Sequence, residues 1–332
     1  MLSDGLRTNK RLEKAYKMLT RVPLFAGARR KAVEIEPLGS LTNMSYKIVF
    51  NETAYALRLP GHDTWEYIDR AAEERNSKIA AAAHIGADVL YVDAGSGMMV
   101  TRFVEGETMD AAWLAQDTEA LARVTRTLRG VHDLGRNFRF RFNVFGMLER
   151  YRDLLYKLRQ PLPVGYGEVE RGAEAARRAL EASPFPLVPC HNDPWPNNFI
   201  DAGERIYLID WEFSGMNDPL WDLADLSVEC GLGPEQDRTM MEAYWRGDAT
   251  EGLYSRLELY KAMSDLMWSL WSLIQYANDN PLDDFLADAQ ERFGRCEERI
   301  HGPDFERHLD NVRMYSSVRA PHDEFPERLR VE

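Results

Sequence analysis

The stretch "CHNDPWPNNFI" at Cys190–Ile200 and the run "IYLIDWEF" at Ile206–Phe213 decide the fold. The first stretch holds Asp193 and Asn198 in a loop that two prolines stiffen, and the second is an apolar strand that ends on Asp210. The turn residues between the two runs predict a hairpin. Because a hairpin brings the ends of its two strands together, the three polar side chains are expected to converge.

This trio suits a hard divalent cation. Carboxylate and amide oxygens are the ligands that Mg²⁺ prefers, so Asn198 and Asp210 are candidate Mg²⁺ ligands. Asp193 then stays free to orient a hydroxyl nucleophile. Each residue alone also has an ordinary interpretation, with Asp193 and Asn198 as turn formers and Asp210 as a strand-ending cap. Their combination at this spacing favours phosphoryl transfer.

The pattern His191-x-Asp193-x-x-x-x-Asn198, followed by Asp210-Trp211-Glu212, resembles the catalytic and metal-binding segments of the protein-kinase-like small-molecule kinases. This superfamily contains the aminoglycoside phosphotransferases and the choline/ethanolamine kinases. The resemblance implies an α+β, bilobal protein-kinase-like fold that uses ATP and Mg²⁺. It also implies that Asp193 is the catalytic base, that Asn198 and Asp210 hold the metal, and that His191 braces the loop.

Two features separate the chain from protein kinases. Asn192 stands where an arginine is expected after the histidine, and a new helix begins soon after Asp210, with Asp218 as its N-cap and Pro219 at its first position. This spacing leaves no room for a long activation segment, so a small-molecule acceptor is favoured over a protein. In the family, the residue matching Asp222 holds the backbone of the catalytic loop, and the sequence alone supports an exposed helical aspartate equally well.

Glu212 is expected to support the metal site or to order the catalytic loop. The sequence does not distinguish between these two roles of Glu212.

The rest of the chain divides into a strand-rich and a helical part. Residues 1–104 contain a leading helix from about Thr8 to Thr20 and a second from about Tyr67 to His84, and alternating apolar residues predict strands within 32–40, 45–50, 54–60, 88–94 and 97–103. Residues 105–332 carry helical periodicity at about 117–133, 145–159, 166–182, 235–246, 251–277 and 283–299. We expect an N-terminal nucleotide-binding lobe, with a small antiparallel sheet, and a mainly helical C-terminal lobe.

Nucleotide-binding candidates lie in the first part. The loop after the first strand contains Gly39, Ser40, Leu41, Thr42 and Asn43, whose backbone N–H groups are suited to phosphate oxygens. The resemblance implies that Arg58 is the phosphate-binding basic residue and that Glu73, or else Glu74, is its carboxylate partner. The segment Arg102, Phe103 and Val104 is expected to join the lobes and to meet adenine.

The composition restricts the kinds of partner and location expected for the protein. The net charge of −13 argues against a nucleic-acid partner and favours a small cationic substrate. The cysteines Cys190, Cys230 and Cys296 are odd in number and far apart, so we expect buried, reduced thiols. No apolar stretch is long enough for membrane insertion, and a cytoplasmic location is expected.

Two tryptophans give the acceptor signal. On the predicted helix 251–277, one apolar stripe forms the expected core face, and Trp268 and Trp271 lie off it. Either a second layer of helices covers these indoles or they wall a pocket, where ring faces would recognise a quaternary ammonium. "WSLWSLIQ" at 268–275 resembles the choline kinase segment that contacts the head group, and Glu229 matches a family carboxylate facing it. Asp288, or Phe285 nearby, falls where a third aromatic wall is expected.

The sequence therefore predicts an ATP-dependent kinase that phosphorylates the hydroxyl of choline or of a related amino alcohol such as ethanolamine. The alternatives are an aminoglycoside-type antibiotic phosphotransferase and a catalytically inactive kinase fold used for binding.

Overall fold

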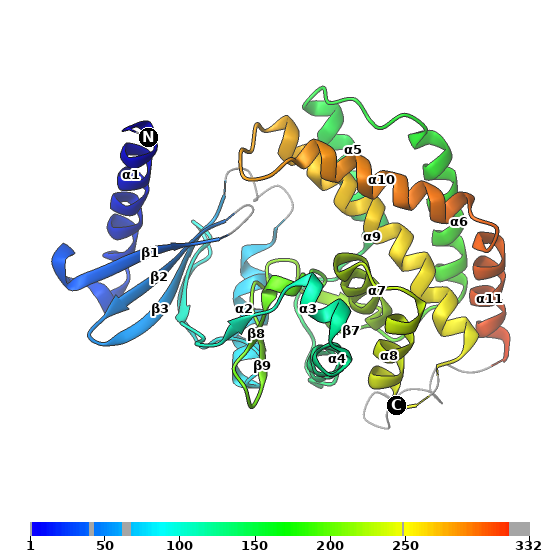
Figure 1. The fold of residues 1–332 in the computed structure, drawn as a ribbon, viewed down its shortest axis with the longest axis horizontal. Helices are drawn as coiled ribbons and strands as arrows, with labels where there is room; N and C mark the ends of the chain where they lie inside the picture. The colour runs from blue at the N-terminus through cyan, green and yellow to red at the C-terminus, as the bar shows by residue number, and fades with distance from the viewer. Residues whose placement is uncertain (1, 40–42, 62–67, 248, 319–332) are drawn as a thin grey trace.

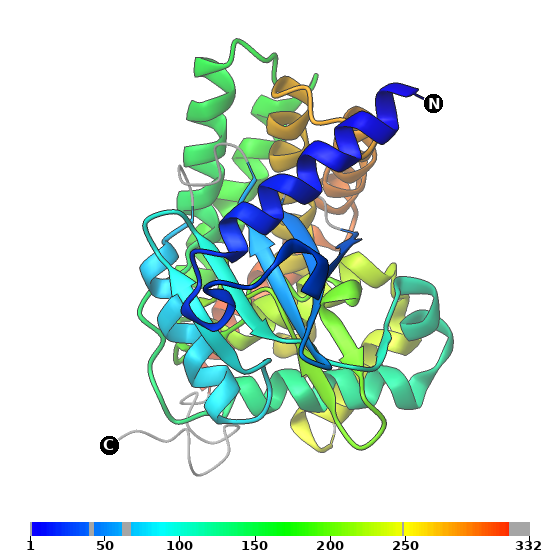
Figure 2. The ribbon, with the colours of Figure 1, turned by 90° about the vertical axis from the view of Figure 1, so that its left-hand side faces the viewer.

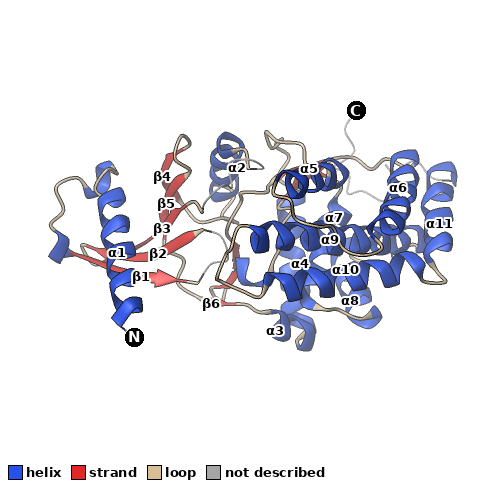
Figure 3. Ribbon diagram, turned by 90° about the horizontal axis from the view of Figure 1, so that it is seen from above, coloured by secondary structure: helices blue, strands red, loops and turns tan. Residues whose placement is uncertain are grey.

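The computed structural model of the 332-residue chain describes residues 2–39, 43–61, 68–247 and 249–318. The strands of the large sheet gather at one end of the molecule and most helices gather at the other (Figures 1 and 3). This arrangement confirms the α+β, bilobal kinase-like architecture that the sequence predicts.

The N-terminal sheet has five antiparallel strands in the order β1-β2-β3-β5-β4. Their bounds are β1 Val33–Leu38, β2 Met44–Phe50, β3 Thr53–Leu59, β4 Val89–Asp93 and β5 Met98–Arg102. Alternation sets the two faces: in β3, Tyr55, Leu57 and Leu59 are buried in the small apolar core, so Arg58 faces the opposite side. Helix α1 (Leu2–Leu19) lies across the outer face, where Leu19 joins that core (Figure 2).

Helix α2 (Arg70–Ala82) carries Glu73 beside the sheet. Asp69 caps it by accepting hydrogen bonds from the backbone N–H groups of Ala71 and Ala72. The buried Asn76 amide donates to the backbone oxygen and the hydroxyl of Ser214, four residues beyond Asp210. This bond fixes α2, and therefore Glu73, against the segment that carries the predicted metal ligand.

Helices make up most of the C-terminal lobe. They are α3 Ala111–Gln116, α4 Thr118–His132, α5 Val144–Lys157, α6 Tyr166–Ala182, α7 Pro219–Cys230, α8 Pro234–Trp245, α9 Glu251–Ala277, α10 Phe285–His301 and α11 Phe305–Val318. The long helix α9 is central, with α5, α7, α10 and α11 packed around it (Figure 1). Its length and burial make it the frame on which the acceptor side of the site is built.

The predicted hairpin is present in the helical lobe. Strand β8 (Phe199–Asp201) pairs antiparallel with β9 (Ile206–Leu208), and the short β6 (Glu107–Thr108) extends the sheet. Strand β7 (Val188–Cys190), which leads into the catalytic loop, pairs with β10 (Gly215–Asn217), which the sequence did not indicate. These two pairings hold both ends of the loop.

Most helix predictions are confirmed within a few residues at each end, but α1 begins at Leu2, well before the predicted start at about Thr8, and α3 and α11 are additional. Cys190, Cys230 and Cys296 are buried free thiols, as expected. Among the described residues no helix combines the length and apolarity needed to cross a bilayer. The division between residues 104 and 105 stays a proposal, as does the cytoplasmic location.

Candidate active site

The catalytic loop is a tight turn between β7 and β8. The backbone oxygen of Asp193 accepts from Trp195 N at 2.8 Å and from the Asn198 amide at 3.1 Å, and Asn198 N donates to Trp195 O at 2.8 Å. A short 3₁₀ turn at Pro196–Asn198 closes the loop. The five-residue spacing therefore has a structural reason, because it lets the side-chain amide of Asn198 hold the backbone of Asp193.

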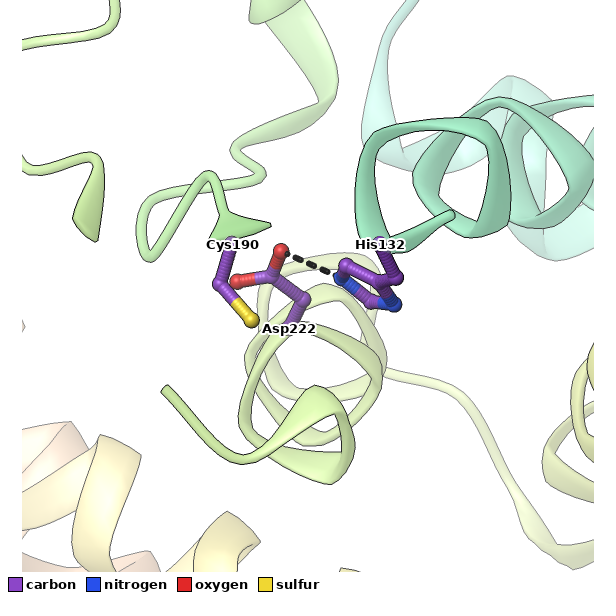
Figure 4. A group of neighbouring side chains, drawn as sticks. All are labelled: His132, Cys190 and Asp222. Atoms are coloured by element: carbon purple, nitrogen blue, oxygen red, sulfur yellow. Dashed lines mark hydrogen bonds and ion pairs between the residues drawn. The ribbon is translucent and has the colours of Figure 1, made fainter. Parts of the chain in front are cut away.

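Asp222 clamps the start of this loop. Its two carboxylate oxygens accept from the backbone N–H groups of His191 at 2.8 Å and Asn192 at 2.7 Å. The His132 ring on α4 contacts the same carboxylate at 3.0 Å, and Cys190 lies alongside (Figure 4). Asp222 is fully buried, so the interpretation as an exposed helical aspartate is wrong.

Asn192 is a structural residue that the sequence did not identify. Its backbone takes φ of 67°, a left-handed conformation that asparagine tolerates. Its side chain donates to Phe213 O at 3.0 Å and accepts from the Asn217 amide at 2.9 Å. The Asn192 side chain therefore ties the catalytic loop to the segment after Asp210.

His191 is fully buried and lies against Trp211, with ring centroids 4.9 Å apart. Its Nε2 contacts Ile209 O at 3.0 Å, and burial lowers the pKa of its imidazole, which favours the neutral ring. These contacts agree with a bracing role.

The structure brings Arg58, Glu73, Asp210 and Glu212 together at the lobe junction. Arg58 forms an ion pair with Glu73 and contacts Asp210 at 2.8 Å, whereas Glu74 pairs with Lys78. Between the two candidates, Glu73 is thus the partner of Arg58. Burial alone would lower the pKa of Arg58, but the surrounding carboxylates, Glu73 first, outweigh it and raise that pKa, so the guanidinium stays charged.

Arg70 is a second cation at this junction, and the sequence analysis did not single it out. Its guanidinium contacts Glu73 at 2.8 Å and Glu212 at 2.9 Å. The only sequence signal was its i,i+3 spacing from Glu73. Asn43, one of the predicted loop residues, donates from its side-chain amide to Glu212 at 3.2 Å. Glu212 therefore holds the nucleotide-side loop and α2 to the helical lobe.

The donor set at this junction fits a hard divalent cation. One carboxylate oxygen from each of Glu73, Asp210 and Glu212 lies within 4.8 Å of the others. Burial, followed by the charge of Glu212, raises the pKa of Asp210 to about 7, although Arg58 lowers it. Asn198 lies next to Asp210 because its backbone oxygen accepts from Ile209 N at 2.9 Å. Asp210 and Asn198 would hold Mg²⁺, with the neighbouring glutamates as further oxygen donors.

The remaining nucleotide-side predictions fall on the inner edge of the sheet and the lobe connection. Open space surrounds the position of a Cβ at Gly39, and Ser40, Leu41 and Thr42 lie outside the described residues. Phe103 N donates to Ala54 O at 3.2 Å, the exposed Arg102 guanidinium lies over the Tyr55 ring, and Val104 is half-buried. Their contact with adenine stays a prediction.

Neighbouring carboxylates influence the carboxyl group of Asp193. Burial, then Asp225, then Asp210, raises the pKa of Asp193 well above its usual value. Glu229 and Glu212 act in the same direction. A carboxyl group in this setting is suited to take up a proton, which is the property that a catalytic base requires.

The aromatic residues predicted for the acceptor side lie in a row of rings. Trp268 meets Phe213 edge-on at 5.4 Å between centroids and Trp271 at 5.7 Å, and Trp271 meets Phe285 at 5.7 Å. Phe285, not Asp288, thus continues the row. Beyond it lies an open hollow, lined by Tyr276, Asp279, Asn280, Asp283, Asp284 and Phe285.

The expectation that the core leaves out Trp268 is wrong. Trp268 is buried within the main hydrophobic core, and Trp271 packs half-buried against it. The serines of α9 are buried too, because Ser264 donates to Asp225, Ser269 to Ala289 O and Ser272 to Asp288. Because each of these serine hydroxyls has a hydrogen-bond acceptor, α9 can be buried on all of its faces.

Glu229 lies on the acceptor side, but Arg292 of α10 already binds it. The guanidinium reaches both carboxylate oxygens, at 2.6 and 3.1 Å, and its Nε contacts Asp288 at 2.9 Å. Asp288 also accepts from Ser272. The charge of Glu229 is therefore offset within the protein.

Comparison with known proteins agrees with this geometry. Residues 34–260 match the sequence profile of the phosphotransferase enzyme family. The crystal structure of a choline/ethanolamine kinase family protein from Mesorhizobium loti is 43% identical, with a TM-score of 0.80 over 91% of this chain and 99% of that one. Choline kinase LicA from Streptococcus pneumoniae has the same fold, with a TM-score of 0.74, 24% identity, and coverage of 86% of this chain and 98% of that one.

Among curated proteins, the protein LicA of Haemophilus influenzae is 24% identical over 269 residues, which is 79% of each chain. The family profile covers most of the chain, and the match to the Mesorhizobium loti protein runs over nearly all of it. This chain is thus a small-molecule kinase of the phosphotransferase enzyme family, and within it the chain belongs to the choline/ethanolamine kinase family.

Proposed function

We propose that this protein transfers the γ-phosphoryl group of ATP to the hydroxyl group of choline or of a closely related amino alcohol such as ethanolamine. The observation that carries the proposal is the position of Asp193. The Asn198 amide binds the backbone oxygen of Asp193 at 3.1 Å, and the backbone oxygen of Asn198 accepts from Ile209 N, next to Asp210. Asp210 in turn contacts Arg58 at 2.8 Å, so the loop that carries the base lies beside the groups proposed to bind Mg²⁺ and phosphate.

In the proposed reaction, the acceptor oxygen attacks the γ-phosphorus in line while the bond to the β–γ bridging oxygen breaks, and ADP leaves. Asp193 takes the hydroxyl proton as the new P–O bond forms. Arg58, oriented by Glu73, donates its N–H groups to phosphate oxygens. Mg²⁺, when bound, neutralises charge on the phosphates. The chain contributes mainly position and fixed charge, which is what phosphoryl transfer requires.

The aromatic row supports a cationic acceptor. A trimethylammonium group has no N–H to donate, so ring faces and carboxylates must recognise it. Trp268, Trp271 and Phe285 supply rings, and the hollow beyond them is lined by Asp279, Asp283 and Asp284.

A panel of acceptors with ATP and Mg²⁺ tests the proposal. Phosphate transfer to choline or ethanolamine supports it, transfer only to aminoglycosides supports an antibiotic kinase, and no transfer at all supports an inactive fold. Competition between choline and ethanolamine in the same assay then ranks the two amino alcohols.

The pH dependence of turnover should reveal the base. Only the carboxylate form of Asp193 accepts a proton, and burial with Asp225 raises its pKa. We therefore expect kcat to fall as pH is lowered through that raised pKa, well above the pH at which an ordinary aspartate titrates. Steady-state kinetics from pH 5 to 9 at saturating substrates measure this. A kcat that stays flat down to pH 5 would contradict the assignment.

The tryptophans should affect the acceptor and not the nucleotide. Replacing both Trp268 and Trp271 with alanine is expected to raise the KM for choline about ten-fold or more, because each cation–π contact is worth roughly 0.5–2 kcal/mol. The KM for ATP should change by less than about three-fold on the same reasoning. Since Trp268 is in the core, thermal unfolding and a Trp271→Phe variant, which keeps a ring, serve as controls. Equal increases in the Michaelis constants for choline and ATP would show that the two indoles only pack in the core and do not bind the acceptor.

A further inference from the structure

Asp225 on α7 is a buried carboxylate that the reaction outlined above does not use. Its side chain is completely buried. One oxygen, Oδ1, accepts from Trp268 Nε1 at 2.7 Å and from Ser264 Oγ at 2.5 Å. The other oxygen, Oδ2, is buried without a hydrogen-bond partner in the part of the chain that the structure describes.

An unpartnered carboxylate oxygen is costly in the interior of a protein. A buried polar atom normally has a partner, and a buried charge normally has a counter-charge. Burial, followed by the charge of Glu229, raises the pKa of Asp225 well above its usual value. The bonds from Trp268 and Ser264 hold the carboxylate in place and do not neutralise it. A cation supplied from outside would satisfy Oδ2.

Position relates Asp225 to the acceptor. Its Oδ1 is bonded to the Trp268 indole, and that indole contacts the rings of both Phe213 and Trp271 in the aromatic row. Glu229, one turn further along α7, is already bound by both nitrogens of the Arg292 fork. Of these two carboxylates, Asp225 alone has an oxygen free for a ligand.

We propose that Asp225 is the specificity-determining carboxylate of the acceptor site, with Oδ2 facing the positively charged nitrogen of the amino alcohol while Trp268 supplies the adjoining ring. This inference rests on the proposed function and assigns its cation recognition to Asp225 instead of Glu229. Arg292 then has a definite effect: because it binds both carboxylate oxygens of Glu229, Asp225 is the one of these two α7 carboxylates whose second oxygen has no hydrogen-bond partner among the described residues.

The test compares choline with its neutral carbon isostere, 3,3-dimethylbutan-1-ol, in wild type and Asp225→Asn. Asparagine keeps Oδ1 for Trp268 and Ser264 and removes the charge. We expect the ratio of kcat/KM for choline to that for the isostere to fall at least ten-fold, while kcat/KM for the isostere changes less than about three-fold. Glu258→Gln, which removes one negative charge about 15 Å along the same helix as Trp268, is the matched control and should keep the ratio.

Thermal unfolding and the KM for ATP show whether the variant is folded. If Asp225→Asn fails to fold, Asp225→Ser replaces it, since the smaller side chain leaves room for water. A wild-type enzyme that is active on choline, together with an unchanged ratio in the folded variant, would overturn this inference alone. A wild-type enzyme that phosphorylates no amino alcohol would instead defeat the proposed function, so the two failures are distinguishable.

Discussion

Replacing Asp193 with asparagine is expected to lower kcat by about 10²–10⁴-fold, the contribution of a positioned general base. Asparagine has nearly the same shape but takes up no proton from the acceptor hydroxyl. The loop should survive, because Trp195 N and the Asn198 amide bond to the backbone oxygen of residue 193 and not to its side chain. The Kd for ATP should therefore remain within about two-fold of wild type.

The same substitution should make the protein more stable at neutral pH. The pKa of Asp193 is raised in the folded state, so between its unfolded and folded pKa values the folded protein holds the extra proton. Stability then falls as pH rises through this window, and an uncharged side chain removes that loss. Activity that falls while the melting temperature rises is the pattern expected of a residue kept for catalysis at a cost in stability.

Asp201, on the hairpin that follows the catalytic loop, provides the control. Arg123 binds it with both nitrogens, and that hydrogen bonding lowers the pKa of Asp201, so its stabilising contribution is present above the unfolded pKa and is lost as pH falls through the folded one. Asp201→Asn should destabilise the protein by about 1–3 kcal/mol and leave kcat nearly unchanged. Kinetics and unfolding curves at pH 6 and 8 compare the two variants. Turnover of Asp193→Asn within ten-fold of wild type would remove Asp193 from the role of base.

Features encoded locally were predictable from the sequence. The hairpin, the position of Asp193 in its loop and the helix boundaries all follow from turn residues and periodicity within short segments. For the partner of Arg58, the family resemblance implied a helix carboxylate. The sequence left two adjacent candidates, Glu73 and Glu74. Only the fold showed that Glu74 faces Lys78 instead.

Contacts between distant segments were not predictable. Arg292 binds Glu229 across two helices far apart in sequence, and no local pattern marks such a pair. Asp225 left a weak signal, since Asp222, Asp225 and Glu229 recur at i, i+3 and i+7 on one helix face. The burial of Ser264 and Ser272 on α9 was not predictable either, because only the carboxylates of neighbouring helices make it favourable.

The second large effect is expected at Arg58. Arg58→Ala removes the guanidinium that we propose binds the phosphates, and we expect kcat/KM for ATP to fall about 10²–10³-fold, the loss typical for one such donor group. Arg58→Lys keeps the charge without the fork and should fall between alanine and wild type. Steady-state kinetics with ATP as the varied substrate measure all three proteins.

Arg58→Ala is expected to lower stability as well as activity, and a second variant can separate the two effects. Removing Arg58 leaves Glu73, Asp210 and Glu212 with Arg70 as the remaining guanidinium in contact with them among the described residues, so Arg58→Ala should also destabilise the fold by about 3–5 kcal/mol. Replacing both partners of a buried pair is often close to neutral, so the double variant Arg58→Met with Glu73→Gln should recover most of the stability. It should not recover activity, because neither new side chain binds phosphate. A double variant that regained turnover together with its melting temperature would show that Arg58 holds the lobes together and plays no part in binding ATP.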